Sequence, residues 1–357
     1  MRAARGAAGG DTDVDLEGRF LLPALVNAHD VLDLSTLPPL GRPPYASLYE
    51  WTRAAEGDIE RLGPALAVPL VDRLFLGGLR NLLAGVASVL HHHPDHRSLA
   101  QASFPVRVQR RYGFAHSPGL TMALRKTYRT SDRRVPWLVR AVEGALPGLR
   151  AELDVLAAAN VLRQNTVILH GTALAPEDAP RLAAAGASVV WCPESDLRLY
   201  GRTAPFAALR DGGVGVGLGS DAPSAGARDA LSNLAAARRE GVLDDTGLLH
   251  LATRDSAAVA RLAPGGFEDG APADLLAVDS PERLLEGDRL AVGLLLVRGE
   301  VVCGEASLLA QAGRAAVEIS LDGGRRALAL PLARRLATIL RRSPAAHEAQ
   351  WLSGVEL

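Results

Sequence analysis

Cysteine, lysine and aromatic residues are scarce in this chain of 357 residues. Its two cysteines, Cys192 and Cys303, form no CxxC pair, which excludes a disulfide framework and a cysteine zinc site. Lys126 is the single lysine, and Phe, Trp and Tyr together make up 4% of the residues. Because so few cysteines are typical of a reducing compartment, we expect a cytoplasmic protein.

Long uninterrupted hydrophobic runs are also missing. The most apolar stretch, 65–90, contains Asp72, Arg73 and Arg80, which argues against a membrane span. The N-terminus is polar and glycine-rich, unlike a signal peptide. The formal net charge of −1 would attract neither nucleic acid nor anionic lipid. We expect a small molecule as partner, with no nucleic acid and no membrane, and a homo-oligomer stays open.

The chain is rich in short apolar runs that alternate with helical patterns. Runs that are apolar on both faces, each followed by a helix, predict a parallel sheet covered on both sides. We predict strands at 20–26, 85–90, 106–110, 136–139, 166–169, 188–191 and 214–218, and helices at 149–162, 204–210, 229–240 and from 176 to Gly186. The eighth strand of a barrel is not evident. The glycines of 213–219 fall within a strand and therefore do not predict a dinucleotide site.

The tail of the chain has a different pattern. Short strands at 274–278, 293–297 and 301–302 suggest a small β module, and 331–342 reads as an amphipathic helix with Leu332, Leu336 and Ile339 on one face. We therefore expect a barrel over residues 20–267. Residues 1–19 and 268–357 would form a small β domain with a C-terminal helix. The segment before Phe20 is short, so either the chain starts late or this domain is truncated.

Several predicted strands end in polar residues, which matters because active sites of α/β barrels lie where strands end. A single polar strand end has a structural explanation, but several together indicate one pocket. The groups concerned are Asn27-Ala28-His29-Asp30, His91-His92-His93, Arg140 with Glu143, His170, and Ser220-Asp221.

The same segments resemble the amidohydrolase superfamily, in its branch of cytosine deaminases, chlorohydrolases and adenosine-type deaminases. Residues 22–29 resemble the "lPGlvnaH" opening, 85–89 the "GvTTv" strand and 191–197 the "cPeSNl" loop. Residues 218–221 resemble the "lGtD" strand end, and 270–276 the "GspADLlv" return to the small domain. The resemblance covers about residues 18–305 and implies a (β/α)8 TIM barrel of the α/β class.

The metal ligands that the resemblance implies are only partly present. His29 matches the first histidine of a His-x-His pair, but Val31 stands at the second, and Arg140 stands at the histidine of "HxxE". Asp221 matches the aspartate ligand, so His29 and Asp221 are remnants of a metal site that is not intact. Neither valine nor arginine offers a lone pair to zinc. We therefore expect no metal cofactor.

Zinc or iron would bind only if His91, His93 or other residues replaced the lost ligands. The remaining pocket residues receive other assignments. The resemblance implies that Glu143 shuttles protons and that His170 orients substrate or water. Together with Asp221 and Arg140, these form the predicted catalytic set. We assign substrate binding to His29, His92, Glu194 and Asp196.

A buried guanidinium needs carboxylate partners, so we predict that Arg140 pairs with Glu143, Asp221 or both. Two hypotheses of function follow. One is a deaminase-type hydrolase of non-peptide C–N bonds with weak or no metal dependence, in which Asp221 or Glu143 acts as base and Arg140 stabilises an oxyanion. The other is an inactive pseudoenzyme that binds a ligand or a partner subunit.

Overall fold

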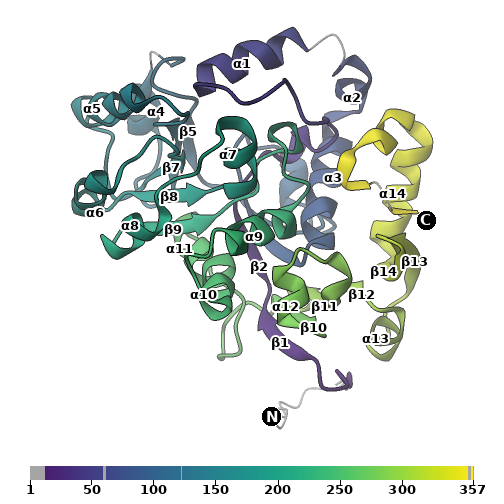
Figure 1. Ribbon diagram of the computed structural model, residues 1–357. Helices are drawn as coiled ribbons and strands as arrows, with labels where there is room; N and C mark the ends of the chain where they lie inside the picture. The colour runs from purple at the N-terminus through teal and green to yellow at the C-terminus, as the bar shows by residue number, and fades with distance from the viewer. Residues whose placement is uncertain (1–12, 59–61, 122, 353–354, 357) are drawn as a thin grey trace.

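Eight parallel strands in the described part of the chain surround the centre of the molecule (Figure 1). The computed structural model describes residues 13–58, 62–121, 123–352 and 355–356, so residues 1–12 of the predicted N-terminal segment lie outside it. The strands form a three-stranded sheet, β2-β3-β4, and a five-stranded sheet, β5-β6-β7-β8-β9. Their bounds are Leu25–Asp30, Val86–His91, Arg107–Gln109, Gly113–Ala115, Trp137–Ala141, Thr166–His170, Ser188–Trp191 and Gly215–Leu218.

This arrangement confirms the predicted (β/α)8 barrel. Every neighbouring pair within the two sheets is parallel, and Asp221 N donates to His29 O at 3.0 Å where β9 meets β2. The strand that the sequence did not indicate is β5. It has three residues, too few for a recognisable pattern.

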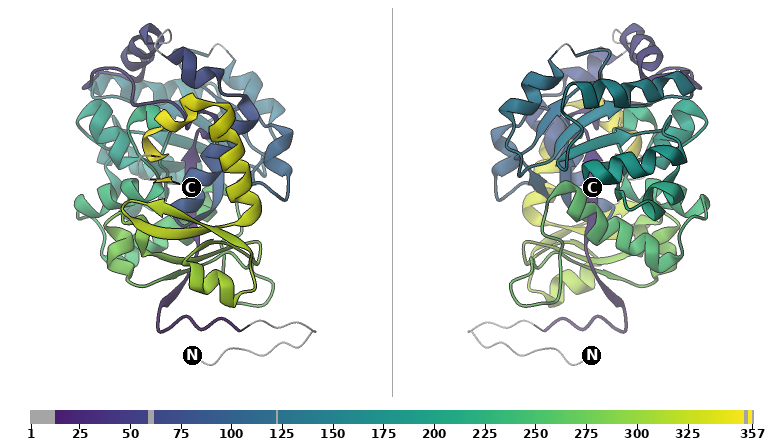
Figure 2. Two further views of the ribbon diagram at one scale, coloured as in Figure 1. Left: turned by 90° about the vertical axis from the view of Figure 1, so that its right-hand side faces the viewer. Right: turned by 90° about the vertical axis from the view of Figure 1, so that its left-hand side faces the viewer.

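Helices cover the outside of the barrel (Figure 2). Ser47 caps α1, accepting a hydrogen bond from Glu50 N, and Asp229 caps α9 in the same way through Ser232 N. The segment 191–197, expected to be a loop, instead enters a helix that begins at Pro193. The helices up to the barrel's end are α1 (Leu48–Gly57), α2 (Gly63–Ala67), α3 (Leu70–Leu83), α4 (Leu124–Thr130), α5 (Glu152–Ala158), α6 (Ala179–Ala185), α7 (Pro193–Tyr200), α8 (Phe206–Asp211), α9 (Ala230–Arg239), α10 (Asp245–His250) and α11 (Ser256–Ala260).

A second, antiparallel sheet joins the two ends of the described chain. Its seven strands run in the order β1-β10-β11-β12-β14-β13-β15. The predicted strand 20–26 is in fact two strands, because β1 pairs with β10 in this sheet whereas β2 enters the barrel. The strands are β1 (Phe20–Pro23), β10 (Leu275–Val278), β11 (Val292–Val297), β12 (Glu300–Gly304), β13 (Ala316–Leu321), β14 (Gly324–Ala329) and β15 (Val355–Glu356). The sequence did not indicate the last three.

Three helices accompany this sheet: α12 (Pro281–Leu285), α13 (Ala306–Gln311) and α14 (Leu330–Arg342). The predicted C-terminal helix is α14, which lies beside α3 in Figure 1 and buries Leu332, Leu336 and Ile339. Arg335 stacks over the ring of Phe75 on α3, at 4.2 Å from its centroid. The division of the chain into a barrel domain and a small β domain, with boundaries near residues 20 and 268, stays a proposal. Among the described residues, none of the helices is both long and apolar enough to span a membrane.

The interior of the barrel is filled by a small apolar cluster that includes Ala28, Leu138, Leu169 and Val190. A larger core lies between strands and helices and contains the fully buried Trp137. The ionisable side chains of the predicted site lie above this apolar packing, at the carboxyl ends of the strands.

Candidate active site

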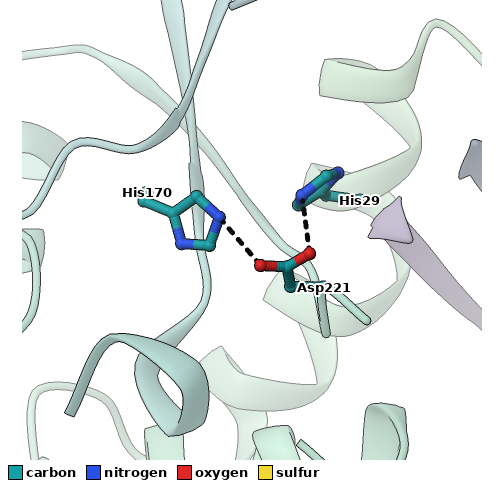
Figure 3. A group of neighbouring side chains, drawn as sticks. All are labelled: His29, His170 and Asp221. Atoms are coloured by element: carbon teal, nitrogen blue, oxygen red, sulfur yellow. Dashed lines mark ion pairs between the residues drawn. The ribbon is translucent and has the colours of Figure 1, made fainter. Parts of the chain in front are cut away.

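Three side chains from three strand ends converge above the apolar interior (Figure 3). His29 lies on β2, His170 ends β7, and Asp221 follows β9. Asp221 Oδ1 is 3.4 Å from His29 Nε2, and its Oδ2 is 3.2 Å from His170 Nε2. All three side chains are at most 2% exposed, so their interactions act with little screening by water.

Local geometry holds two of these residues in unusual conformations. His170 has φ of 66° and Asp221 has φ of 55°, a left-handed region that non-glycine residues rarely adopt. Asp196 on α7 faces His170 Nδ1 at 2.7 Å and accepts a hydrogen bond from Thr203 Oγ1 at 3.0 Å. Backbone strain of this kind is concentrated at functional sites, and here both strained residues aim side chains at one point.

Arg140 forms a buried pair with Glu143, as the sequence predicted. Its Nε and Nη2 donate to the two Glu143 oxygens at 2.8 and 2.5 Å, and Nη2 lies 3.5 Å from Asp221 Oδ2. The Tyr200 hydroxyl donates to Glu143 Oε1 at 2.6 Å, and the guanidinium carbon lies 5.2 Å from the Trp51 ring centroid. The guanidinium of Arg140 is therefore held by a bidentate pair with Glu143, by the charge of Asp221 and by the ring of Trp51.

The pKa values in the site follow from burial and from these charges. Burial would raise the pKa of Asp221, but Arg140 and the two histidines hold it well below its ordinary value. For Glu143, burial is likewise outweighed by Arg140, and the pKa is lowered. Burial would lower the pKa of His170, but Glu143 and Asp196 raise it to about 10. Burial lowers the pKa of His29. The carboxylates of Asp221 and Glu143 are therefore ionised and lie beside the cationic side chains of Arg140 and His170.

The donor atoms of His29, His170 and Asp221 fit a divalent cation. His29 Nδ1 and Nε2, His170 Nε2 and Asp221 Oδ2 are buried without a hydrogen-bond partner. One ligand atom from each residue lies within 4.8 Å of the others. Imidazole nitrogen and carboxylate oxygen are ligands that zinc accepts, and three protein ligands are usual in a catalytic zinc site. The charge of Arg140 beside Asp221 opposes a second cation but does not occupy a donor atom of either histidine.

The other predicted residues have different surroundings. The ring of His92 lies edge-on to His29, with centroids 5.2 Å apart. His93 Nδ1 contacts Asp33 at 2.9 Å, and His91 Nε2 lies 4.0 Å from the same carboxylate. Within the described residues, the candidate metal group does not include these two histidines.

The side chain of Glu194, on α7, contacts helix α9 and not the cluster of His29, His170 and Asp221. Its carboxylate accepts a hydrogen bond from Ser232 on α9 at 2.5 Å. Asp196, also assigned to substrate binding, instead contacts His170. These two assignments remain predictions.

A cavity of about 490 Å³ opens beside the site. Its described lining joins polar groups, including His92, His116, Arg140 and Asp221, to an apolar wall that includes Leu34, Leu37, Trp51 and Leu66. Val31, where the resemblance implies a ligand, is part of this lining. The volume suits a small organic molecule that meets Asp221 at its inner end.

Two contributors, Trp51 and Tyr200, were missed by sequence reasoning. Tyr200 lies four residues after Asp196 on α7, so both share one helix face. Treating 193–200 as a helix would have indicated Tyr200. Trp51 lies on α1, and we find no local sequence signal that connects it to Arg140.

Comparisons with known proteins agree with this fold. A model of the amidohydrolase family matches residues 135–303. The 5-methylthioadenosine/S-adenosylhomocysteine deaminase of Haloquadratum walsbyi is 36% identical over 129 residues, 34% of this chain and 29% of that protein. The protein of the same name in Halobacterium salinarum is 29% identical over 329 residues, 76% of this chain and 75% of that protein. The chain therefore matches under a third of the first relative's length and three quarters of the second's.

Solved structures share the whole architecture. An adenosine deaminase from Xanthomonas campestris with bound zinc has a TM-score of 0.69 at 19% identity, covering 91% of this chain and 85% of its own. An atrazine chlorohydrolase from Arthrobacter aurescens complexed with zinc has a TM-score of 0.64 at 18% identity, covering 91% and 88%.

The expectation that the protein needs no metal cofactor was wrong. It considered only His29 and Asp221 as remaining ligands and treated His170 as a substrate group. The structure adds His170 to the donor set, and solved proteins of this fold contain zinc. The family match over residues 135–303 and the shared fold support the predicted resemblance to the amidohydrolase superfamily.

Proposed function

We propose that this protein is a metal-assisted hydrolase of a non-peptide C–N bond, and that it deaminates a small purine nucleoside. The observation that carries the proposal is the convergence of His29, His170 and Asp221 beside a cavity of about 490 Å³. Relatives named as deaminases of 5-methylthioadenosine and S-adenosylhomocysteine support the substrate class.

In this proposal, His29, His170 and Asp221 hold a divalent cation, with zinc as the first candidate. With a pKa of about 10, metal-free His170 carries a proton on Nε2, which a bound cation would displace. Nε2 is the atom that would bind because Nδ1 faces Asp196, an arrangement in which a carboxylate fixes the orientation of a metal-binding histidine. When bound, the cation supplies Lewis acidity that makes water a better nucleophile near neutral pH. His170 thus moves from the substrate-orienting role inferred from the sequence to the metal site.

In this proposal the side chains around the cation transfer protons and stabilise charge on the substrate. Asp221 stays ionised because Arg140 and the histidines lower its pKa, so it can accept a proton at Oδ2. Arg140 lines the cavity and places its guanidinium where negative charge would develop on the substrate. Glu143 keeps Arg140 in place through the bidentate pair. His92 lies in the cavity wall and faces the substrate there.

The proposal includes a cytoplasmic location for the protein. Cys192 and Cys303 are free and buried, which fits the cytoplasmic location expected from the sequence. A small molecule is the expected partner, and the oligomeric state stays a prediction.

Ammonia release is the direct test. The purified protein, with and without added zinc, is supplied with adenosine, 5-methylthioadenosine and S-adenosylhomocysteine. We expect zinc-dependent release from at least one substrate, a loss of about 100-fold or more in Asp221→Asn, and unchanged activity in His250→Ala, which alters an exposed histidine on α10. Absence of release from all three with zinc present would reject the proposal in favour of a non-catalytic binding role.

A further inference from the structure

A buried polar network lies directly behind His29 and Asp221. Its members come from β2, from the loop after β9 and from α3, and all are at most 2% exposed. They are Asn27, Asp30, Arg80, Asn81 and Ser220. Burying this many polar groups is costly unless each is satisfied, so the network requires an explanation beyond packing.

Arg80 is the centre of this network. Its Nη2 donates to Asp30 Oδ1 at 2.5 Å and to the backbone carbonyl of Asp221 at 3.1 Å. Its Nη1 donates to the carbonyl of Arg228 at 3.3 Å. One side chain from α3 therefore joins the residue after His29 to the backbone of Asp221.

Asn27 provides a second connection between the same two segments. Its Oδ1 accepts from Ser220 N at 3.0 Å and from His29 N at 3.3 Å. Its Nδ2 donates to Ser220 Oγ and Asn81 Oδ1, both at 2.8 Å. The backbone at His29 and at Asp221 is thus held by Asn27 and Arg80. Neither side chain belongs to the described lining of the cavity.

This connection matters because Asp221 adopts a left-handed conformation with φ of 55°. A non-glycine residue keeps such a conformation only where surrounding contacts hold it. The bond from Arg80 to the Asp221 carbonyl is one of those contacts, and that backbone orientation directs the carboxylate toward His29 and His170.

We propose that Arg80, braced by Asp30, is a positioning residue that sets the relative placement of His29 and Asp221. Its role is to hold the donor atoms together, not to contact substrate. The part of this inference that concerns metal affinity rests on the proposed function, whereas the placement of the side chains does not.

Histidine-selective NMR of the metal-free protein tests the placement. The nine histidines are labelled with ¹⁵N, and His29 and His170 are assigned from His29→Gln and His170→Gln. We expect Arg80→Lys, which keeps the charge but has a shorter reach and no fork, to shift both signals and to leave those of His250 and His347 in place. Asp30→Asn should shift the same two signals.

Arg289→Lys is the matched control. Arg289 is also 1% exposed, pairs with Asp322 and donates to the Trp351 carbonyl at 2.8 Å, but it belongs to the segment beside the antiparallel sheet. It should lower stability without shifting His29 or His170. Unchanged signals in Arg80→Lys, or equal shifts in Arg289→Lys, would overturn the proposal. So would unfolding of both network variants, since the network would then hold the fold and not the site.

Calorimetric titration with zinc provides the second readout. We expect Arg80→Lys to weaken zinc binding by about 10- to 100-fold and Arg289→Lys to leave it unchanged. If the native protein binds no zinc, the metal centre of the proposed function fails, and the histidine spectra still decide the positioning role. If native and Arg80→Lys bind zinc equally, the positioning role fails while the metal centre stands.

Discussion

Arg140 Nη2 and Asp221 Oδ2 lie 3.5 Å apart, so a permanent positive charge contacts the carboxylate that we assign to the metal. At this separation two charges interact by several kcal/mol in a partly shielded interior. The same charge that keeps Asp221 ionised therefore also limits how tightly a cation binds beside it. Arg140 stands where the resemblance implies a histidine ligand, so one substitution alters both ligand number and local charge.

Replacing Arg140 should reveal this competition. We expect Arg140→His to tighten zinc binding by roughly tenfold, because it removes a cation and offers a further ligand. Val31→His should help less, since Arg140 remains, and the double variant should bind most tightly. Calorimetric titration of the four proteins measures this order. The control is Arg150→His, which breaks a partly buried pair with Asp178. A double variant no better than either single one would contradict the assignment.

Asp196 should control the state of His170. In Asp196→Asn the negative charge beside Nδ1 is lost, so the pKa of His170 in the metal-free protein should fall from about 10. NMR titration of the His170 ring measures this change. Zinc affinity should also drop by about tenfold, because the tautomer is less firmly fixed. Asp154→Asn, which alters an exposed partner of Arg181, should change neither quantity.

Tyr200→Phe tests the support of Glu143. Burial raises the pKa of Glu143, whereas Arg140 and the Tyr200 hydroxyl lower it, with a net lowering. A carboxyl with a depressed pKa stabilises the fold above its unfolded pKa, and that stability is lost as pH falls through the folded value. Without the hydroxyl the folded pKa is less depressed, so we expect about 1–2 kcal/mol less stability at pH 7. The loss on acidification should be smaller and should be complete at a higher pH.

Urea unfolding between pH 3 and 7 measures the difference. Tyr128→Phe is the control, because its hydroxyl donates to the neutral Asn165 side chain at 2.8 Å. It should lower stability by a similar amount at every pH. If Tyr200→Phe behaves in the same way, the hydroxyl does not stabilise the charged form of Glu143.

Glu194 predicts the opposite pH dependence. Burial raises its pKa from 4.5 to about 7, so the fold favours the neutral acid. No penalty exists below the unfolded pKa, a penalty grows between pH 4.5 and 7, and it is complete above pH 7. Glu194→Gln should therefore be more stable than the native protein at pH 8, by about 3 kcal/mol, and similar to it below pH 4.5. Equal stability at pH 8 would show that Glu194 carries no such penalty.

The sequence predicted the barrel and the polar strand ends because both depend on local pattern. Apolar runs followed by helices define parallel strands, and the residues after each strand meet at one edge regardless of the loops between them. For that reason Arg140, Glu143, His170 and Asp221 could be grouped in advance. The ion pair of Arg140 followed from the cost of burying an unpaired charge.

Features that depend on distance in space were missed. Which nitrogen of His170 faces Asp221, and how close it lies to His29, depends on a left-handed backbone that the sequence does not reveal. The three-residue strand β5 has no periodicity to detect. Strand β13 does alternate apolar Val317, Ile319 and Leu321 with polar Glu318 and Ser320, so its pattern was available and was overlooked. Its partner β14 lacks such alternation, and β15 has only two residues.

Only Ala24 separates β1 from β2, although the two strands belong to different sheets. Ala24 N donates to the carbonyl of Asp274, and β1 pairs with β10, so the segment leading to His29 is completed by residues about 250 positions later. During synthesis on the ribosome, β1 must therefore wait unpaired until β10 has emerged. Such long-range pairing slows folding, and it leaves the edge of β1 available to other chains until β10 is present.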